Sequence, residues 1–341
     1  MQNLIEKNDY LLDENGNLKH KGYATSLILD YDRKMIKAKK YRIKEWDYYL
    51  IYNDNYAIAL TIDDNYYMGL VSASFINLKD KWEKTVSPMF FFPKGNVNLP
   101  SSSKNGDSIK QGKGYSFKFL IKDNKRILDC TIDNFMNNKP YKIYFELNNE
   151  PKDSIVIATP FNKKGHFYYN QKIVGFNAIG NVVIDGKTIE FNDNTYALLD
   201  WGRGVWTYKN TWYWGAGCGK VCNDLIGFNL GYGFGDTSNA SENMIFINGE
   251  SLKLDQITFN IPTNKKGKDD YLSPWTIISN DGIINFTFTP IIDRKSNTNA
   301  LIIQSNQHQV FGTINGTINI NNKIIEIKDF VCFFEKVVNR W

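Results

Sequence analysis

GNVVIDGKTIEFNDNTYALLDWGRGVW, residues 180–206, combines a β-hairpin with residues that could carry chemistry. Its two arms carry apolar residues, Val182, Val183 and Ile184 on one and Ile189 and Phe191 on the other. Asp185-Gly186 between the arms is the kind of pair that adopts the two positive φ angles of a tight hairpin turn. The apolar strand that follows ends in the carboxylate of Asp200. The segment therefore predicts a β fold that contains a candidate acidic site.

The same construction returns near the end of the sequence, where residues 316–327 read GTININNKIIEI. Its turn is expected at Asn321-Asn322. We interpret the match as an internal duplication in which each half closes with a hairpin, a carboxylate and a tryptophan, the alternative being chance similarity between two hairpins. The aligned pairs are Gly180 with Gly316, Lys187 with Lys323, Glu190 with Glu326 and, after a one-residue deletion, Asp200 with Glu335 and Trp206 with Trp341.

Length and composition favour a globular protein of two domains, because 341 residues exceed one typical domain. The net charge of +5 comes from 41 basic and 36 acidic residues spread along the chain, which argues against a nucleic-acid-binding protein. The sequence has no CxxC pair and its three histidines lie far apart, so we expect no structural zinc site. The four cysteines are Cys130, Cys218, Cys222 and Cys332.

The first residues, MQNLIEKNDY, are polar and charged, which argues against a signal peptide. No apolar run approaches the ~20 residues that cross a bilayer. We therefore expect a cytoplasmic protein without a membrane span. Nothing in the sequence indicates the oligomeric state.

Short β-rich runs separated by turn residues follow one another along the chain, at spacings typical of barrels and sandwiches. We expect a loop at Asn98–Gly114 and a single helical turn at Asp133–Asn138. Two antiparallel barrels in tandem fit the length and the duplication, with residues 1–206 as the first domain and 207–341 as the second; two packed sandwiches are the alternative. The expected strands include Asp47–Tyr52, Tyr56–Ile62, Tyr66–Phe75, Tyr115–Ile121, Lys125–Asp133, Tyr141–Leu147, Thr211–Gly219, Leu225–Phe234, Ile245–Ile247, Ile257–Ile261, Pro274–Ile278, Ile283–Phe288 and Ala300–Gln304.

Asp200 is the first candidate catalytic residue. A carboxylate at the end of an apolar strand, next to Trp201, would be partly desolvated, which raises its pKa and suits a general acid. Arg203 would favour the anion instead, and the two residues could equally form a structural ion pair. Glu242 could supply a second carboxylate, although a turn or capping role is the alternative for Glu242 and Asn243.

Aromatic residues crowd after Asp200. Trp206, Trp212 and Trp214 could form a wall for an apolar, aromatic or sugar-ring ligand, or pack in a barrel core. Upstream, His166, Tyr168, Asn170 and Lys172 form a polar and aromatic group of candidate substrate-binding residues, to which we add Trp201 and Asn243. Cys218 and Cys222 would bind a soft metal only on a helix, and their glycine-rich surroundings argue against one.

KEWDYYLI at 44–51, HFYYNQK at 166–172, YALLDWGRGVWTYKNTWYWG at 196–215, GFNLGYG with SENM, and the final FFEKVVNRW together resemble domain-of-unknown-function family 2804 over nearly the whole chain. There is also a more distant similarity to the tandem-lipocalin carotenoid hydratase and AttH-like proteins. It lies in the hairpin, in the Asp that follows it with Leu and Trp on either side, and in the W-x-W segment. That resemblance implies two consecutive lipocalin-like (calycin) barrels, an apolar ligand cavity and, in some members, acid-catalysed hydration, isomerisation or cyclisation. Asp200 falls on the Asp of their W-x-D motif, with Leu198 in place of the aromatic residue, and Cys332 stands where a small glycine is expected.

Three functional hypotheses follow. The leading one is a tandem-lipocalin enzyme without a cofactor, in which Asp200 protonates a lipophilic or aromatic small molecule while Arg203 and Glu242 set its ionisation or position water. Indole faces would stabilise the carbocation formed. The second is a non-catalytic carrier of an apolar metabolite. The third is a hydrolase that acts on a sugar with Asp200 and Glu242.

Overall fold

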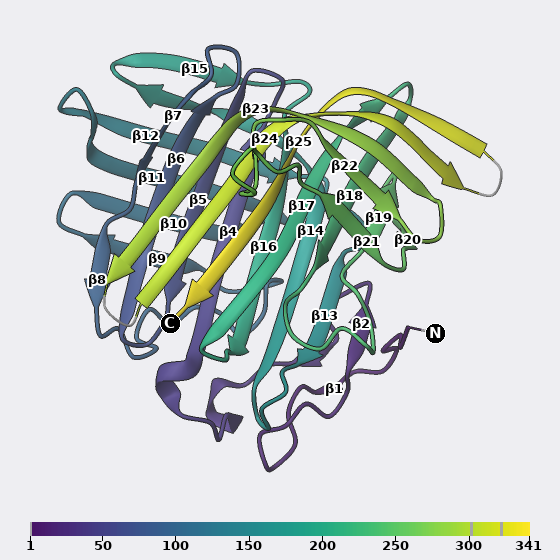
Figure 1. The fold of residues 1–341 in the computed structure, drawn as a ribbon. Coiled ribbons are helices and arrows are strands. Elements are labelled where there is room, and N and C mark those ends of the chain that lie inside the picture. The colour runs from purple at the N-terminus through teal and green to yellow at the C-terminus, as the bar shows by residue number, and fades with distance from the viewer. Residues whose placement is uncertain (1, 301–302, 321–322) are drawn as a thin grey trace.

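The computed structural model describes residues 2–300, 303–320 and 323–341, and its regular structure is almost entirely β-strand. Two 3₁₀ turns, η1 (Arg33–Met35) and η2 (Lys40–Arg42), are the only helical elements among these residues. The prediction of an all-β protein is confirmed. Two curled sheets pack against each other, with the green to yellow strands of the second lying across the purple to teal strands of the first (Figure 1).

The first sheet holds fourteen strands, and its hydrogen-bonded pairs are antiparallel. It curls until β9 approaches β5 and β11 approaches β7. Four short strands pair beside its main path, and β1 (Asp9–Tyr10) and β3 (Leu29–Asp30) form a separate parallel pair. The main path runs β7 (Trp82–Val86), β6 (Met68–Asn77), β5 (Tyr56–Asp64), β4 (Ile43–Tyr52), β16 (Tyr196–Val205), β14 (Phe167–Ile184), β12 (Lys139–Asn148), β11 (Lys125–Met136), β10 (Tyr115–Lys122) and β9 (Ser108–Gly112), with β2 (Gly22–Ala24), β8 (Met89–Phe91), β13 (Ile155–Pro160) and β15 (Lys187–Phe191) beside it.

The second sheet holds nine antiparallel strands. It also curls, which brings β21, at one end of the sheet, close to β18. The backbone amide of Phe259 in β21 donates a 3.2 Å hydrogen bond to the Tyr232 hydroxyl at the end of β18. The strand order is β20 (Glu250–Lys253), β19 (Met244–Ile247), β18 (Asp224–Tyr232), β17 (Lys209–Val221), β25 (Lys323–Arg340), β24 (Ile303–Ile320), β23 (Ile284–Ala300), β22 (Trp275–Ser279) and β21 (Ile257–Asn260).

The chain passes from the first sheet to the second between Val205 and Lys209. The division into independent domains at residue 206 stays a prediction. The N-terminal segment crosses this division, because the Asn3 amide donates to the carbonyl of Asn239 and the Gln2 side chain donates to that of Leu254.

Each sheet encloses an apolar core, and a third core lies between the sheets. Strand alternation explains this arrangement, since successive side chains of one strand point to opposite faces of its sheet. In β16, Leu199 packs in the core of the first sheet and Leu198 in the core between the sheets. In β25, Phe334 packs in the core of the second sheet and Phe333 in the core between the sheets.

The structure confirms some of the predicted turns and loops and differs from others. Asp185-Gly186 forms the predicted turn, with φ angles of 50° and 78°. The helical turn at Asp133–Asn138 was wrong, because β11 continues through a register shift to Met136 and Asn137-Asn138 form a hairpin turn with positive φ. The loop at Asn98–Gly114 contains β9, which pairs with β10. The turn at Asn321-Asn322 and part of the strand Ala300–Gln304 lie outside the described residues.

Candidate functional site

Asp200 lies on the face of β16 that meets the second sheet. It follows Leu198 by two residues, and Leu198 belongs to the core between the sheets. The register places Tyr48 of β4 and Lys172 of β14 directly beside Asp200 on either side. Residues opposite each other in antiparallel strands present their side chains to the same face. Tyr48, Asp200 and Lys172 therefore form one row across the first sheet.

A second row lies across the second sheet. Gln309 of β24 and Trp214 of β17 stand directly opposite Glu335 of β25. The amide of Gln309 donates to the Glu335 carboxylate at 3.1 Å and to the Tyr48 hydroxyl at 3.3 Å, which joins the two rows. The rings of Tyr48 and Trp214 also meet edge to face, with centroids 6.0 Å apart. We call the two rows, together with Glu242, the inter-sheet site.

Lys172 links the sheets by an ion pair with Glu242, which lies between β18 and β19. Its ammonium also donates to the Tyr168 hydroxyl at 3.1 Å and to the Asn170 side-chain carbonyl at 3.0 Å. Both members of the ion pair are buried. A buried charge needs such compensation, because its transfer out of water is costly. Lys172 and Glu242 therefore form the charged part of the site.

Asp200 accepts a 2.5 Å hydrogen bond from the Asn170 amide, which also donates to the backbone carbonyl of Trp201 at 2.9 Å. Burial raises the pKa of Asp200 above its ordinary value, and the nearby Glu242 charge adds to the rise. The Lys172 charge and hydrogen bonds from Asn170 and Trp46 oppose it without reversing it. Asp200 thus holds a proton at a higher pH than an exposed aspartate does.

Glu335 has a similar environment in the second sheet. Its carboxylate accepts a 2.8 Å hydrogen bond from the Trp212 indole in addition to the bond from Gln309. Burial raises the pKa of Glu335 to about 7, and the Asp200 charge adds to the rise, whereas Trp212, Arg294 and Gln309 act in the opposite direction. A carboxyl group with this pKa can donate or accept a proton near neutral pH.

An aromatic cluster lies next to the two rows. There the face of β16 that meets the second sheet carries two glycines, Gly202 and Gly204. A Cβ on Gly202 would come within 2.0 Å of the Trp46 ring, so the glycine allows this indole to lie across the strand. Trp46 stacks on Tyr168 at 6.1 Å and meets Trp206 edge to face at 5.3 Å. The aromatic cluster consists of Trp46, Phe161, Tyr168, Trp206, Trp212, Phe234 and Trp341.

The structure brings together eight of the predicted site residues. Asp200 and Glu242 are both buried, with 8% and 9% of their residue surface exposed, so the two side chains are enclosed. Trp214 contributes an indole N–H that donates to Asn229 at 2.7 Å. Seven of the eight belong to the inter-sheet site or the aromatic cluster, and the eighth, Asn170, is hydrogen-bonded to Asp200 and Lys172. The seven are Tyr168, Lys172, Asp200, Trp206, Trp212, Trp214 and Glu242.

Arg203 lies elsewhere, and an ion pair between Arg203 and Asp200 does not form. The two residues are three positions apart on β16 and therefore point to opposite faces. Arg203 pairs with Asp47 at 3.0 Å and donates to the backbone carbonyls of Trp46 and Pro100 at 2.7 Å each. Its guanidinium also lies 4.3 Å from the ring centroid of Trp201, which packs in the core of the first sheet. Arg203 and Trp201 thus stabilise the first sheet from inside.

His166 and Asn243 have local structural contacts. The His166 ring contacts the backbone carbonyl of Lys164 at 3.1 Å, in the turn before β14. The Asn243 side chain accepts a 2.7 Å hydrogen bond from the backbone of Gly231 and donates to that of Asp255 at 2.8 Å, so it fastens the start of β19.

Several members of the site were not among the predicted functional residues. Glu335 had been aligned with Asp200 in the proposed duplication, and that alignment was the signal that could have identified it. Trp46 and Tyr48 alternate along β4 and so share a face, but the sequence does not show which face. Gln309 and Phe234 carry no signal that separates them from other polar and aromatic residues.

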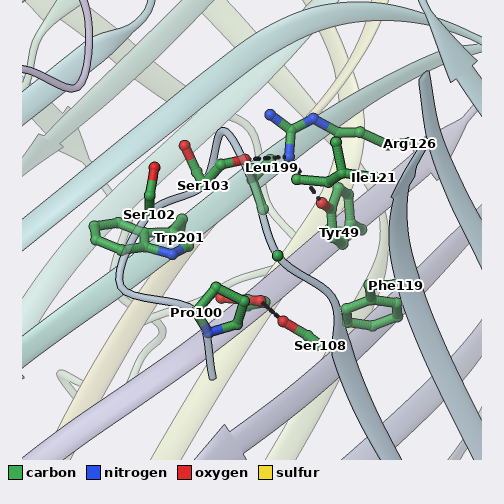
Figure 2. A pocket seen from close by; sticks show the side chains of 12 residues that line it. Tyr49, Pro100, Ser102, Ser103, Ser108, Phe119, Ile121, Arg126, Leu199 and Trp201 are labelled. Carbon is green, nitrogen blue, oxygen red and sulfur yellow. Dashed lines mark hydrogen bonds between the residues drawn. The ribbon is translucent and has the colours of Figure 1, made fainter. Parts of the chain in front are cut away.

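Two pockets lie away from the inter-sheet site. The first is a water-sized space of about 10 Å³ inside the first sheet, beneath residues 100–108, where Trp201 lies beside Pro100 and Arg126 donates to Ser103 and Tyr49 (Figure 2). The second is a groove of about 970 Å³ between the sheets at the other end of β14, lined by residues that include Asn177, Thr195 and Asn248. Neither is lined by Asp200 or Glu335.

Two properties of the described residues concern metal binding and membrane insertion. No group of three or more His, Cys, Asp or Glu side chains is arranged to hold a metal ion in that part of the chain. Cys218 is buried in a strand and Cys222 is exposed in the turn after it. None of the helical elements in the described ranges is long and apolar enough to cross a membrane.

The fold and the site define a β protein with a buried polar and aromatic site between two curled sheets. The chain belongs to the family described as a domain of unknown function, DUF2804, whose model matches residues 2–341. The resemblance to that family and to AttH-like proteins is confirmed.

Two solved structures are similar in fold. An AttH-like protein, NE1406, from Nitrosomonas europaea shares 10% identity at a TM-score of 0.56, over 90% of this chain and 96% of that one. Kievitone hydratase from Nectria haematococca shares 11% identity at a TM-score of 0.50, over 97% of this chain and 98% of that one. No curated protein matches in sequence.

Proposed function

We propose that the inter-sheet site performs acid/base chemistry of the hydratase, isomerase or cyclase type, without a cofactor, on a lipophilic or aromatic small molecule. The observation that carries the proposal is the presence of two buried carboxyl groups with raised pKa values, Asp200 and Glu335, on facing sheets beside an aromatic cluster. A carboxyl group that keeps its proton near neutral pH serves as a general acid.

Asp200 would donate the proton, and Glu335 would take one up or direct water. The Lys172–Glu242 pair would hold Asn170 in the orientation that contacts Asp200. Indole faces of the aromatic cluster would stabilise positive charge formed on the substrate. Arg203, which lies on the opposite face of β16, has no part in these steps.

The similarity to kievitone hydratase supports a reaction of this class, since that protein is named a hydratase and has the same fold. We further propose that each curled sheet is a lipocalin-like barrel, with residues 1–206 and 207–341 as domains related by the duplication. A cytoplasmic location also stays a proposal from the sequence.

The test compares the wild type with Asp200→Asn. Each protein is incubated with a lipid-soluble extract of its native cells, and chromatography with mass spectrometry detects compounds that gain or lose one water or become isomers. We expect conversion by the wild type and none by Asp200→Asn, with unchanged circular dichroism and melting. Asp129→Asn, a half-exposed carboxylate on the outside of β11, is the matched control and should convert normally. Equal conversion by Asp200→Asn would refute the acid role.

A non-catalytic carrier is the second candidate, and the enclosed nature of the aromatic cluster favours it. Native mass spectrometry of the purified protein would then show one apolar compound retained unchanged. The sugar hydrolase receives less support, because Glu242 is already paired with Lys172.

A further inference from the structure

The ring of Phe234 occupies the centre of the aromatic cluster. Its centroid lies 4.8 Å from Trp206, 4.8 Å from Tyr168 and 5.4 Å from Trp212, with each pair meeting edge to face. Phe161 closes a fourth side at 5.1 Å. These are the arrangements that aromatic pairs prefer. The surrounding rings thus form a receptacle for one flat aromatic group, and Phe234 fills it.

Phe234 differs from the rings around it in the backbone that carries it. Tyr168 and Trp212 lie within the long strands β14 and β17, and Trp206 directly follows β16. Phe234 lies in the connection between β18 and β19, between Gly233 and Gly235, which have φ angles of 89° and 77°. Glycines adopt such angles freely, so the backbone on both sides of Phe234 can change conformation at low cost. Phe234 is therefore the member of the receptacle best able to leave it.

The indole N–H of Trp206 is buried and has no hydrogen-bond partner among the described residues. It lies over Gly204, since a Cβ there would be 3.3 Å from the Trp206 indole nitrogen. Gly204 shares the face of β16 that carries Asp200, because the two are four residues apart. In contrast, the indoles of Trp212 and Trp214 donate to Glu335 and Asn229. A donor is thus available on the wall of the receptacle, and an acceptor atom of a ligand would satisfy it.

We infer that the ligand is an aromatic compound with a hydrogen-bond-accepting oxygen, which displaces the ring of Phe234 and accepts a hydrogen bond from Trp206. This inference rests on the inter-sheet site being the functional site. Its oxygen would lie at Trp206, and the Trp46 ring, which covers Gly202, separates this position from Asp200 along β16.

The first test measures binding of 2-acetylnaphthalene and of the matched hydrocarbon 2-ethylnaphthalene by calorimetry. The wild type should bind the ketone about fivefold more tightly, the effect of one net hydrogen bond. Trp206→Phe keeps a ring but removes the N–H, so it should bind the two compounds equally. Trp275→Phe is the control, because the Trp275 N–H is also buried without a partner but lies in the core of the second sheet. Absence of a preference in the wild type, or its persistence in Trp206→Phe, would overturn the assignment of the oxygen.

The second test measures displacement of Phe234. Hydrogen exchange of the backbone amides of residues 233–240 should accelerate when 2-acetylnaphthalene binds, and Phe234→Leu, which retains an apolar side chain, should bind the ketone several times more tightly. Unchanged exchange, or weaker binding by Phe234→Leu with intact folding, would show that Phe234 is a fixed part of the core. Both tests measure binding alone, so an Asp200→Asn protein that converts substrate as well as the wild type and keeps the ketone preference would refute the acid role and leave this inference standing.

Discussion

Asp200 and Glu335 hold equivalent positions in their sheets, since each is the middle residue of a three-residue row on the face that meets the other sheet. The sequence alignment that suggested a duplication also pairs these two carboxylates. It pairs Trp206 with Trp341 as well, and their rings lie 6.4 Å apart in the aromatic cluster. Under a duplication, one ancestral surface would have supplied a carboxylate and a tryptophan from each half to a shared site.

Glu335 should make the protein less stable as the pH rises. The pKa of Glu335 is about 7 in the folded protein, against an ordinary value of 4.5. Between these values the unfolded chain loses a proton that the folded protein retains, so the free energy of unfolding falls with rising pH. The loss is about 3 kcal/mol in total.

Chemical denaturation of the wild type and Glu335→Gln at pH 4.5, 6 and 7.5 measures this contribution. The difference in unfolding free energy between the two proteins should shift in favour of Glu335→Gln as the pH rises. Buried groups that do not interact with Glu335 titrate equally in both proteins and cancel in the comparison. A difference that stays constant across this range would show that burial does not raise the pKa of Glu335.

Removal of the Lys172 charge should be strongly destabilising. Lys172→Met leaves the carboxylate of Glu242 buried without its cation, which costs about 3 to 5 kcal/mol. Lys152→Met breaks the exposed ion pair with Glu250 and should change stability little. Urea denaturation of both variants provides the comparison. Similar values for the two would mean that water, not Lys172, compensates Glu242.

Gly202→Ala should disturb the site through Trp46. The added Cβ would come within 2.0 Å of the Trp46 ring, and relief of that clash must move the indole or the strand. We expect a loss of about 1 to 3 kcal/mol. Gly219→Ala, whose Cβ would meet its nearest neighbour at 3.2 Å, is the milder control. Thermal melting and near-ultraviolet circular dichroism should both change in Gly202→Ala; an unaltered aromatic signal would contradict the close packing of Trp46 on β16.

Much of the fold could be predicted from local patterns, because turn chemistry and alternation are encoded within a few residues. Asp185-Gly186 has the residue types that its φ angles require. Alternation alone also separates Asp200 from Arg203, so their proposed interaction could have been rejected from the sequence. In contrast, the sequence does not encode the order of strands in a sheet directly. The meeting of Tyr48 with Gln309 depends on that order and on how the sheets pack.

The site was predicted best where its residues are close in sequence. Tyr168, Asn170 and Lys172 alternate along one strand and share a face, which the pattern of the segment indicates. Glu335 and Phe234 come from distant segments, and their roles depend on burial and on neighbours from the other sheet. By residue type alone, Glu335 and Phe234 cannot be distinguished from other glutamates and phenylalanines.

The protonation state of the buried carboxyl groups tests the account most directly. Infrared difference spectroscopy of protein labelled with ¹³C in the Asp and Glu carboxyls detects the C=O stretch of protonated groups as the pH is raised. We predict that protonated carboxyl persists at pH 6.5, and that part of its signal is lost in Asp200→Asn and part in Glu335→Gln. A spectrum at that pH in which neither substitution removes any protonated carboxyl would contradict the central claim that the facing rows hold an acid ready to donate its proton.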